Sequence, residues 1–180
     1  MAATVLVGAA KVKVQADFDK TVDFTGVHTW AWYAEGAGDV KMARSSEDDP
    51  VPIQRRFGPT IVDAVAKEFA LRKLTAVTEA PDVRIHYYLL VTVGFDTQIT
   101  GQFLPPVAAW GVPPFTPSTS SYKITQNGAL VLDAVSTKLN RVVWRGIAQT
   151  EIDQAKNDDQ RDARIRDVVH ELVAKFPPKK

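Results

Sequence analysis

The chain has 180 residues, of which 45% are hydrophobic and 24% are charged, and its formal net charge is +1. This length and composition predict one globular domain with its own hydrophobic core. A charge so close to zero, with no basic stripe along the chain, argues against nucleic-acid binding, which depends on attraction to phosphates. The sequence contains no cysteine, and this excludes disulfides, thiol catalysis and cysteine zinc sites.

Residues 2–10 are mostly small and apolar, and they end in Gly8-Ala9-Ala10. This ending fits the small-x-small pattern at which secretory signal peptides are cleaved. We interpret residues 1–10 as the remnant of a signal peptide; the alternatives are an ordinary first strand and a disordered N-terminus. No stretch of the sequence approaches the roughly 20 apolar residues of a membrane-spanning helix.

The first half of the chain contains two predicted strands and a helix. Residues 11–18 alternate between apolar and polar side chains, which predicts a half-buried strand, and the aromatic and β-branched residues 27–33 predict a second strand. Residues 34–49 are polar and contain glycine, which is typical of a loop. A helical pattern begins at Asp49-Pro50 and is expected to end near Leu74. Pro59 should kink this helix or begin a new one.

The second half is predicted to be richer in strands. Residues 82–95 place an apolar side chain at nearly every odd position, which indicates a central strand. A short strand is expected over residues 122–126, followed by a tight turn at Asn127-Gly128. Residues 129–135 and 141–150 then form a hairpin. Asn157, with Gln160 three residues on, predicts the capped start of a last helix that stops at Pro177-Pro178.

This order of elements, β-β-α-β-β-β-β-α, defines the expected fold class. It predicts an α+β domain over residues 11–178, with two helices packed on one face of a mostly antiparallel β-sheet. The predicted hairpin should place Trp144 in the core and Arg145 on the opposite face, where Arg145 either pairs with a carboxylate or stays exposed. Gly146 should leave room for a large neighbour or for a bulge.

Residues 99–121 form a long predicted loop that is rich in proline, glycine, serine and threonine. Its prolines exclude a regular helix or a central strand, and loops of this length in compact domains are usually functional or disordered. Aromatic and large apolar side chains in this loop are candidate contacts for a binding partner, and they are Phe103, Leu104, Trp110 and Phe115. Alternatively, the loop folds back and covers the sheet.

The sequence offers no recognisable catalytic or metal-binding arrangement. His28, His86 and His170 are not spaced as metal ligands, and we expect His28 and His86 to be exposed or at a sheet edge. The acidic stretch 45–49 lacks the ligand spacing of a calcium loop, and no nucleophile elbow occurs. We therefore predict no catalytic, cofactor or metal residues and a protein that is not an enzyme.

Five motifs in order resemble the bacterial envelope family called domain of unknown function 4136. They are the stretch 17–32 with its Thr-Trp-Ala-Trp strand, the helix ending in Ala-Lys-Glu-Phe, the Ala-Pro-Asp strand from residue 80, the hairpin 128–146 ending in Trp-Arg-Gly, and Ala-Lys-Phe-Pro-Pro at 174–178. The chain departs from the family pattern at Lys73, Ala129 and Ser136, where members have glycine, threonine and aspartate. It also lacks the cysteine that lipid-modified members carry.

The resemblance implies a lipoprotein-like domain of the cell envelope with no established activity. We therefore expect a periplasmic or otherwise extracytoplasmic protein, not lipid-anchored because it has no cysteine. The resulting hypothesis is a non-enzymatic domain that binds an envelope protein or a surface component and needs no cofactor. The alternative is a carrier or sensor of a small apolar ligand held between the helices and the sheet.

Overall fold

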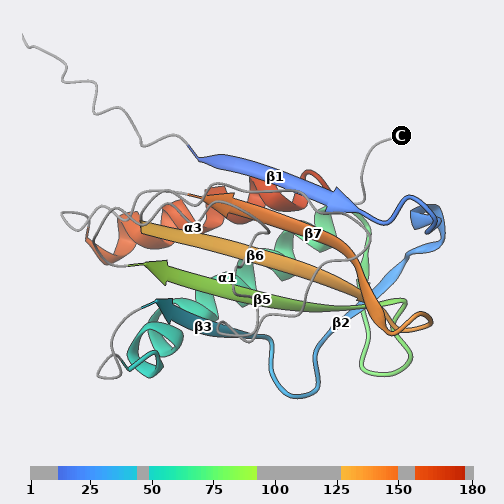
Figure 1. The fold of residues 1–180 in the computed structure, drawn as a ribbon, viewed down its shortest axis with the longest axis horizontal. Coiled ribbons are helices and arrows are strands. Elements are labelled where there is room, and N and C mark those ends of the chain that lie inside the picture. Colours follow the sequence, from blue (N-terminus) through green and yellow to red (C-terminus); the bar gives the residue numbers. More distant parts are fainter. Residues whose placement is uncertain (1–11, 44–48, 93–126, 150–156, 177–180) are drawn as a thin grey trace, which may run out of the picture.

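The structure, a computed structural model, describes residues 12–43, 49–92, 127–149 and 157–176. In these residues, seven strands form one sheet, and two α-helices pack on one of its faces (Figure 1). The strands are β1 (Lys13–Phe18), β2 (Thr29–Trp32), β3 (Gly38–Ala43), β4 (Thr75–Ala76), β5 (Val83–Thr92), β6 (Asn127–Ser136) and β7 (Arg141–Gln149). The helices are η1 (Phe24–Gly26), a short 3-10 helix, and the α-helices α1 (Val51–Leu71) and α3 (Asp158–Val173).

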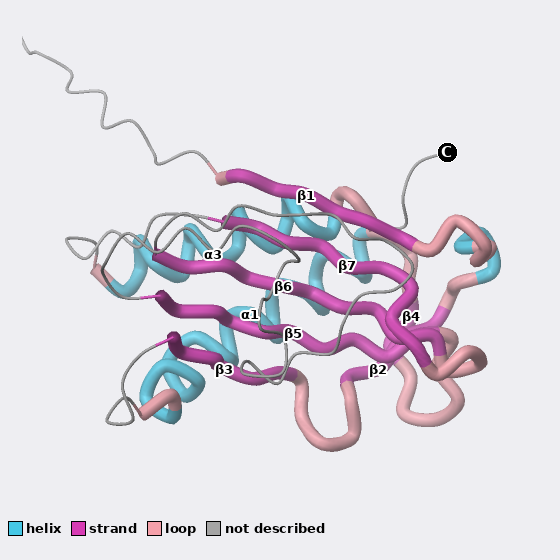
Figure 2. Tube along the Cα trace, viewed as in Figure 1, coloured by secondary structure: helices cyan, strands magenta, loops and turns pink. Residues whose placement is uncertain are grey.

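The sheet is mixed and mostly antiparallel, as the sequence predicts. Its strand order is β1-β7-β6-β5-β2-β4, and β3 pairs with β5 as well. The pairs β1–β7, β7–β6 and β6–β5 are antiparallel, whereas β2 and β3 run parallel to β5. β2 lies along the first part of β5 and β3 along the rest, so the two short strands share one side of β5 (Figure 2).

Strand β3 lies within residues 34–49, where we expected only a loop, so that prediction is wrong. Its first residue, Gly38, lies directly against Tyr87 of β5. A Cβ atom at Gly38 would come within 2.4 Å of the Tyr87 ring and 2.5 Å of the Tyr87 carbonyl oxygen. The strand can therefore approach β5 only because a glycine stands there, and the same glycine makes the sequence look like a loop.

Helix α1 is one continuous helix that contains Pro59, so the alternative that a new helix begins at Pro59 is wrong. The helix ends at Leu71, three residues before the predicted end. Lys73 then adopts a left-handed conformation with φ of 63°. This conformation lets the Leu74 amide donate back to the carbonyl oxygen of Phe69 at 2.9 Å, which is a common way for a helix to terminate.

The hairpin of β6 and β7 departs from the prediction at both ends. Asn127 and Gly128 belong to β6, where they pair with Thr92 and Val91, so the predicted tight turn at these residues is wrong. At the other end, the pairing of β6 with β7 shifts by one residue beside Ala134. Val143 is the extra residue of this bulge, and it lies in the core, although the simple alternation placed it on the opposite face from Trp144.

Helix α3 begins as predicted. The Asn157 side chain accepts a hydrogen bond from the Gln160 amide at 2.9 Å, and the Gln160 side chain accepts one from the Asn157 amide at 3.1 Å. These reciprocal bonds form a capping box, which satisfies two amides that the helix itself cannot. Val173 is the last residue of the helix, and Phe176 follows it into the core.

The core between the helices and the sheet is built around a chain of aromatic rings. Trp32 meets Trp30, Trp30 meets Phe69 of α1, Phe69 stacks on Phe176, and Phe176 meets Trp144 of β7. The centroids of successive rings lie 5.0–5.3 Å apart. Trp144 is fully buried, which confirms its predicted place in the core. Edge-to-face and stacked pairs at such distances add to the stability that burial gives.

Candidate functional site on the outer face of the sheet

A row of polar side chains crosses the sheet on the face that points away from the helices, which we call the outer face. The pairing places His86 of β5 opposite Asp133 of β6, Asp133 opposite Arg145 of β7, and Arg145 opposite Asp17 of β1. We call these four residues the outer row. Their neighbours along the strands, such as Tyr87 and Trp144, point to the opposite face and into the core, because successive side chains of a strand alternate.

Asp133 and Arg145 form a buried ion pair at the centre of the outer row. The Arg145 Nε donates to one oxygen of the Asp133 carboxylate and the Nη2 donates to the other, both at 2.6 Å. The two side chains are 1% and 4% exposed. Such a two-pronged pair holds both groups in one geometry, and removing either side chain would break two charged hydrogen bonds in a buried place.

The residues beside this ion pair are apolar. Val131 and Ile147 lie next to Asp133 and Arg145 on the same face, Leu90 lies on β5, and all three are at most 1% exposed. In a low-dielectric environment of this kind, a charged pair is costly to bury, and removing one partner of the pair is strongly destabilising. In the described part of the outer face, the Asp133–Arg145 pair therefore has buried apolar side chains next to it along the strands, whereas the outer face of a typical two-layer domain is solvated and polar.

Two tyrosines flank His86 at the end of the outer row. The His86 ring centroid lies 5.5 Å from that of Tyr33 and 4.6 Å from that of Tyr88. Burial lowers the pKa of His86, more than the nearby Asp39 carboxylate raises it. Burial also raises the pKa of Tyr88, with the Asp133 charge acting in the same direction. At neutral pH, the imidazole is therefore neutral and the phenol keeps its proton.

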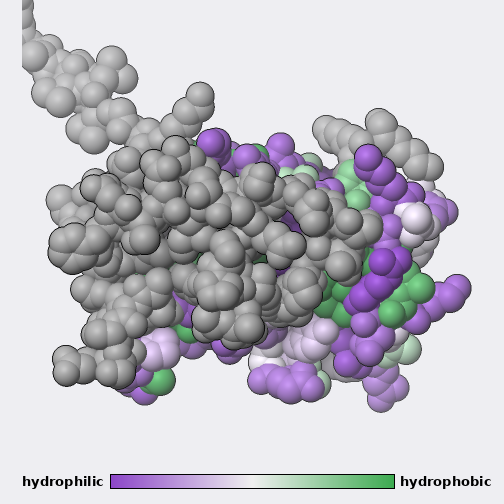
Figure 3. Space-filling model, viewed as in Figure 1, coloured by the Kyte–Doolittle hydropathy of each residue, from purple (hydrophilic) through white to green (hydrophobic). Residues whose placement is uncertain are grey.

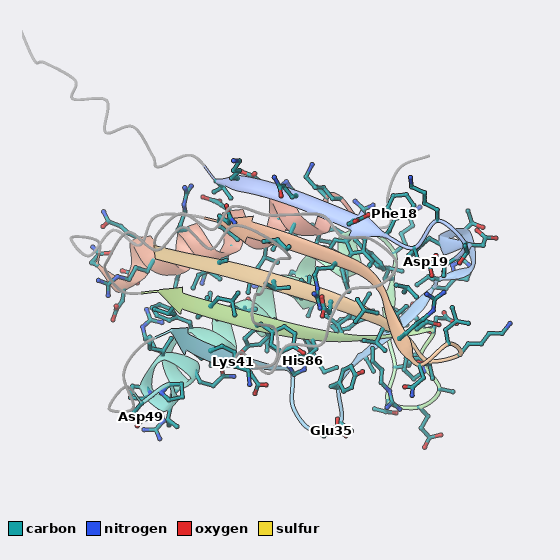
Figure 4. All side chains as sticks on the ribbon, viewed as in Figure 1. Phe18, Asp19, Glu35, Lys41, Asp49 and His86 are labelled. Atoms are coloured by element: carbon teal, nitrogen blue, oxygen red, sulfur yellow. The ribbon has the colours of Figure 1, made fainter. Side chains whose placement is uncertain are left out.

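The outer row meets solvent at a rim formed by β3 and the turn after β2. The Asp39 carboxylate lies 3.3 Å from the Lys41 ammonium and 3.7 Å from the His86 Nε2. Figure 4 shows Lys41, His86 and Glu35 along this rim, and Figure 3 shows hydrophilic residues there. His86 sits on the central strand β5 with a side chain that is 16% exposed, so the expectation of an exposed or edge position is wrong for it.

Two other carboxylates have structural roles. Asp82 Oδ2 accepts hydrogen bonds from the amides of His28 and Thr29 and from the Thr29 hydroxyl, at 2.8–2.9 Å. Asp19, which is buried, accepts from the amide and hydroxyl of Thr21 and pairs with Arg141. These hydrogen bonds lower the pKa of both carboxyl groups, led by the His28 amide for Asp82 and by the Thr21 hydroxyl for Asp19.

The described residues contain no group of three side chains that could hold a metal ion, and none of their helices is long and apolar enough to cross a membrane. His28 precedes β2 and is exposed, as expected, and His170 contacts Glu68 at 3.0 Å. The predicted partner contacts lie outside the described residues, and these are Phe103, Leu104, Trp110 and Phe115. Residues 1–10 and the predicted strand 122–126 also lie outside the described residues.

Sequence reasoning found the faces of this site but not its pairing. The alternation of the hairpin correctly placed Arg145 on the face opposite Trp144 and left the partner of Arg145 open. The structure shows that Asp133 is that partner. The tyrosines and His86 were not recognised as a cluster. Tyr33 directly follows β2, and only the parallel pairing of β2 with β5 brings it beside His86 and Tyr88 of β5.

The motifs that carry the family resemblance occupy structural positions. Trp30, Phe69, Trp144 and Phe176 come from four of the five motifs, and they are the rings that join the helices to the sheet. The fifth motif provides Asp82, which ties the start of β2 to β5. These features define the class of protein as a two-layer α+β domain with a mixed sheet and a shared aromatic core.

The chain belongs to the family described as Domain of unknown function (DUF4136), whose model matches residues 14–178. A solved structure of a DUF4136 family protein from Bacteroides thetaiotaomicron superposes with a TM-score of 0.60 at 14% identity, covering 92% of this chain and 96% of that chain. A PDZ domain protein from Parabacteroides distasonis gives a TM-score of 0.52 at 14% identity, covering 96% of this chain and 37% of that longer chain. No curated protein matches the sequence.

Proposed function

We propose that this chain is a non-enzymatic domain of the bacterial cell envelope that binds an envelope protein or a surface component. The observation that supports this proposal most is the state of the outer row. Its ion pair is closed and buried, its imidazole is kept neutral, and its neighbouring phenol is kept protonated. Such groups fix the shape of a surface, whereas a general acid or base needs a pKa near the working pH and access to a substrate.

The envelope location rests on the family resemblance and on the small apolar residues 2–10. The proposed location is the periplasm or another extracytoplasmic compartment. The near-zero net charge supports a protein or neutral surface component as the partner and disfavours nucleic acid.

The proposed contact is the segment 99–121 with its aromatic residues, and the rim of the outer face offers a second group of candidate side chains. Trp110 and Phe115 are the residue types that most often dominate binding energy at interfaces. On the rim, Tyr33 offers an aromatic ring, and Lys41 offers a partly exposed charge. Phe103 and Leu104 remain predicted contacts of the same segment.

A crosslinking pull-down from the native envelope tests this proposal. Three forms are compared: the wild type, the double variant Trp110→Ala/Phe115→Ala, and a control, Lys67→Ala, whose side chain is exposed on α1. We expect the same crosslinked partner with the wild type and the control, and its loss with the double variant, while all three melt at similar temperatures. Equal capture by all three forms, or a turnover reaction that depends on His86, would contradict the proposal.

The alternative, a carrier of a small apolar ligand between the helices and the sheet, has less support. The described part of that space is filled by buried side chains, including Trp144, Phe69 and Phe176. A ligand would have to displace packed rings, which cores resist. Native mass spectrometry of the purified chain tests this alternative, because a bound ligand would add a constant mass and its absence would weigh against a carrier.

A further inference from the structure

Strand β1 forms an open edge of the sheet. It pairs with β7 on one side, and no strand in the described part of the chain pairs with its other side (Figure 1). The remaining edge is different, because β4 has only two residues and the Gly38 carbonyl of β3 accepts a hydrogen bond from the Gln54 side chain at 3.1 Å. Open edges with unpaired main-chain groups are surfaces on which another strand can be added.

The main-chain groups that point outward from β1 can be identified. The Asp19 amide donates to the carbonyl oxygen of Val143 in β7 at 2.8 Å, so odd-numbered residues of this strand face β7 and even-numbered ones face outward. In agreement, the Phe18 amide bonds to the Asp17 side chain at 2.8 Å and not to β7. Val14 and Ala16 therefore present their amides and carbonyls to the open side.

The residues of β1 are complementary to themselves when the strand is reversed. The sequence Lys13-Val14-Gln15-Ala16-Asp17 has opposite charges at its two ends and small apolar residues on either side of Gln15. If two copies pair antiparallel about Gln15, Lys13 of each copy lies opposite Asp17 of the other on the outer face. Val14 lies opposite Ala16, and the side chains of both point to the helix-facing side. The amides and carbonyls of these two residues can form hydrogen bonds across the junction, in the plane of the sheet.

We propose that β1 is a dimerisation edge, which joins two copies of this chain through antiparallel pairing about Gln15 into one continuous sheet. A two-fold axis through that point repeats the same surface on both copies and closes the assembly as a dimer. It also keeps both pairs of helices on the same side of the joined sheet. The partly buried Val12 and Phe18, which pack against the core, would meet across the junction and lose further exposed surface.

Charge reversals test the register of this pairing. Sedimentation velocity of the full chain should show dimers that dissociate on dilution. Lys13→Asp and Asp17→Lys should each weaken dimerisation by about tenfold or more, because each places like charges opposite one another twice in the dimer. An equimolar mixture of the two variants should dimerise again, because one variant then carries two aspartates along this edge and the other carries two lysines opposite them. The matched control Lys138→Asp changes a charge in an exposed turn and should dimerise like the wild type.

A second variant tests the main-chain bonds. Ala16→Pro removes an amide that points away from β7, so the monomer should keep its fold, and its thermal melt should stay close to that of the wild type. The dimer should be lost. A wild type that stays monomeric at all concentrations would overturn the proposal. A dimer that tolerates Ala16→Pro, or a mixture of charge variants that does not recover, would overturn it as well.

Discussion

Gly146 illustrates how a single missing side chain determines the packing of a large one. A Cβ atom there would lie 2.5 Å from Cη2 and 2.8 Å from Cζ2 of the Trp144 ring, and 2.9 Å from the Leu172 side chain. The ring is fully buried and cannot move aside without disturbing its neighbours. The glycine of the Trp-Arg-Gly motif therefore provides the space in which the tryptophan two residues earlier lies.

We predict that Gly146→Ala lowers the free energy of unfolding by about 1–3 kcal/mol, which is the usual cost of overpacking a core. Urea denaturation measures this change. The control is Gly26→Ala, because a Cβ atom at Gly26 would meet nothing within 4 Å, and its effect should be much smaller. Equal effects of the two substitutions would mean that the tryptophan ring does not depend on this space.

Lys73 is the second informative residue, because it takes a left-handed conformation at the position where the family resemblance implies glycine. We predict that Lys73→Gly raises the free energy of unfolding by about 0.5–1 kcal/mol, since glycine adopts this conformation without steric cost. Lys67→Gly, the same substitution within α1, should instead lower stability by about 1 kcal/mol. Denaturation curves of both variants measure whether the two changes in the free energy of unfolding have opposite signs. A loss of stability in both variants would contradict the prediction.

At the level of elements, the bulge at Val143 sets the outer row. If β6 and β7 continued in the register that pairs Ser136 with Arg141, Asp133 would lie opposite Trp144. The extra residue moves Arg145 into that position instead. Alternation along the hairpin is visible in the sequence and was predicted correctly, except at Val143. The bulge is not visible, because the alternating pattern carries no mark of the one-residue shift between β6 and β7, and for this reason the Asp133–Arg145 pair could not be predicted.

Contacts between residues distant in the sequence also explain the other differences between prediction and structure. Long strands and a capped helix, such as β5 and α3, have local signals that no distant contact overrides, so they were predicted well. Strand β3 exists because Gly38 can lie against Tyr87, and Asn127-Gly128 extend β6 because they lie opposite the end of β5. In both cases a partner distant in the sequence determines the conformation, and local patterns carry no information about it.

The Asp133–Arg145 pair, which joins β6 and β7, yields a prediction about stability. Asp133→Leu alone should lower the free energy of unfolding by about 3–5 kcal/mol, because it leaves a buried guanidinium without its partner. Asp133→Leu combined with Arg145→Leu should recover a large part of this loss. A double-mutant cycle by urea denaturation measures the coupling. For comparison, the exposed pair Asp63–Lys67 should give a coupling below about 0.5 kcal/mol, and similar couplings for both pairs would contradict the buried interaction.

For the whole molecule, the structural carboxylates predict how stability depends on pH. Hydrogen bonds hold the pKa of Asp82 below its ordinary value of 3.8 in the folded state. The native state therefore gives up this proton more readily than the unfolded chain. The stabilisation is fully present above pH 3.8 and is lost as the pH falls through the folded pKa.

We expect Asp82→Asn to be less stable than the wild type at neutral pH and to lose less stability on acidification, so that the two curves converge in acid. Urea unfolding at a series of pH values checks this, and the exposed Asp167→Asn provides a control for the loss of one charge. Curves for Asp82→Asn and the wild type that stay parallel down to the acid limit would show that the carboxylate makes no such contribution.

The order of the strands also determines when the domain can fold during its synthesis. β1 is made first, but its only described partner strand, β7, is made after all the other strands. The ring of Phe176, which links α1 to Trp144, emerges later still. A strand whose partner lies so far along the chain forms its contacts slowly, and it stays unpaired until that partner has been made. The nascent chain therefore carries an unpaired β1 until β7 has been made, and the described sheet is completed only when nearly the entire domain is available.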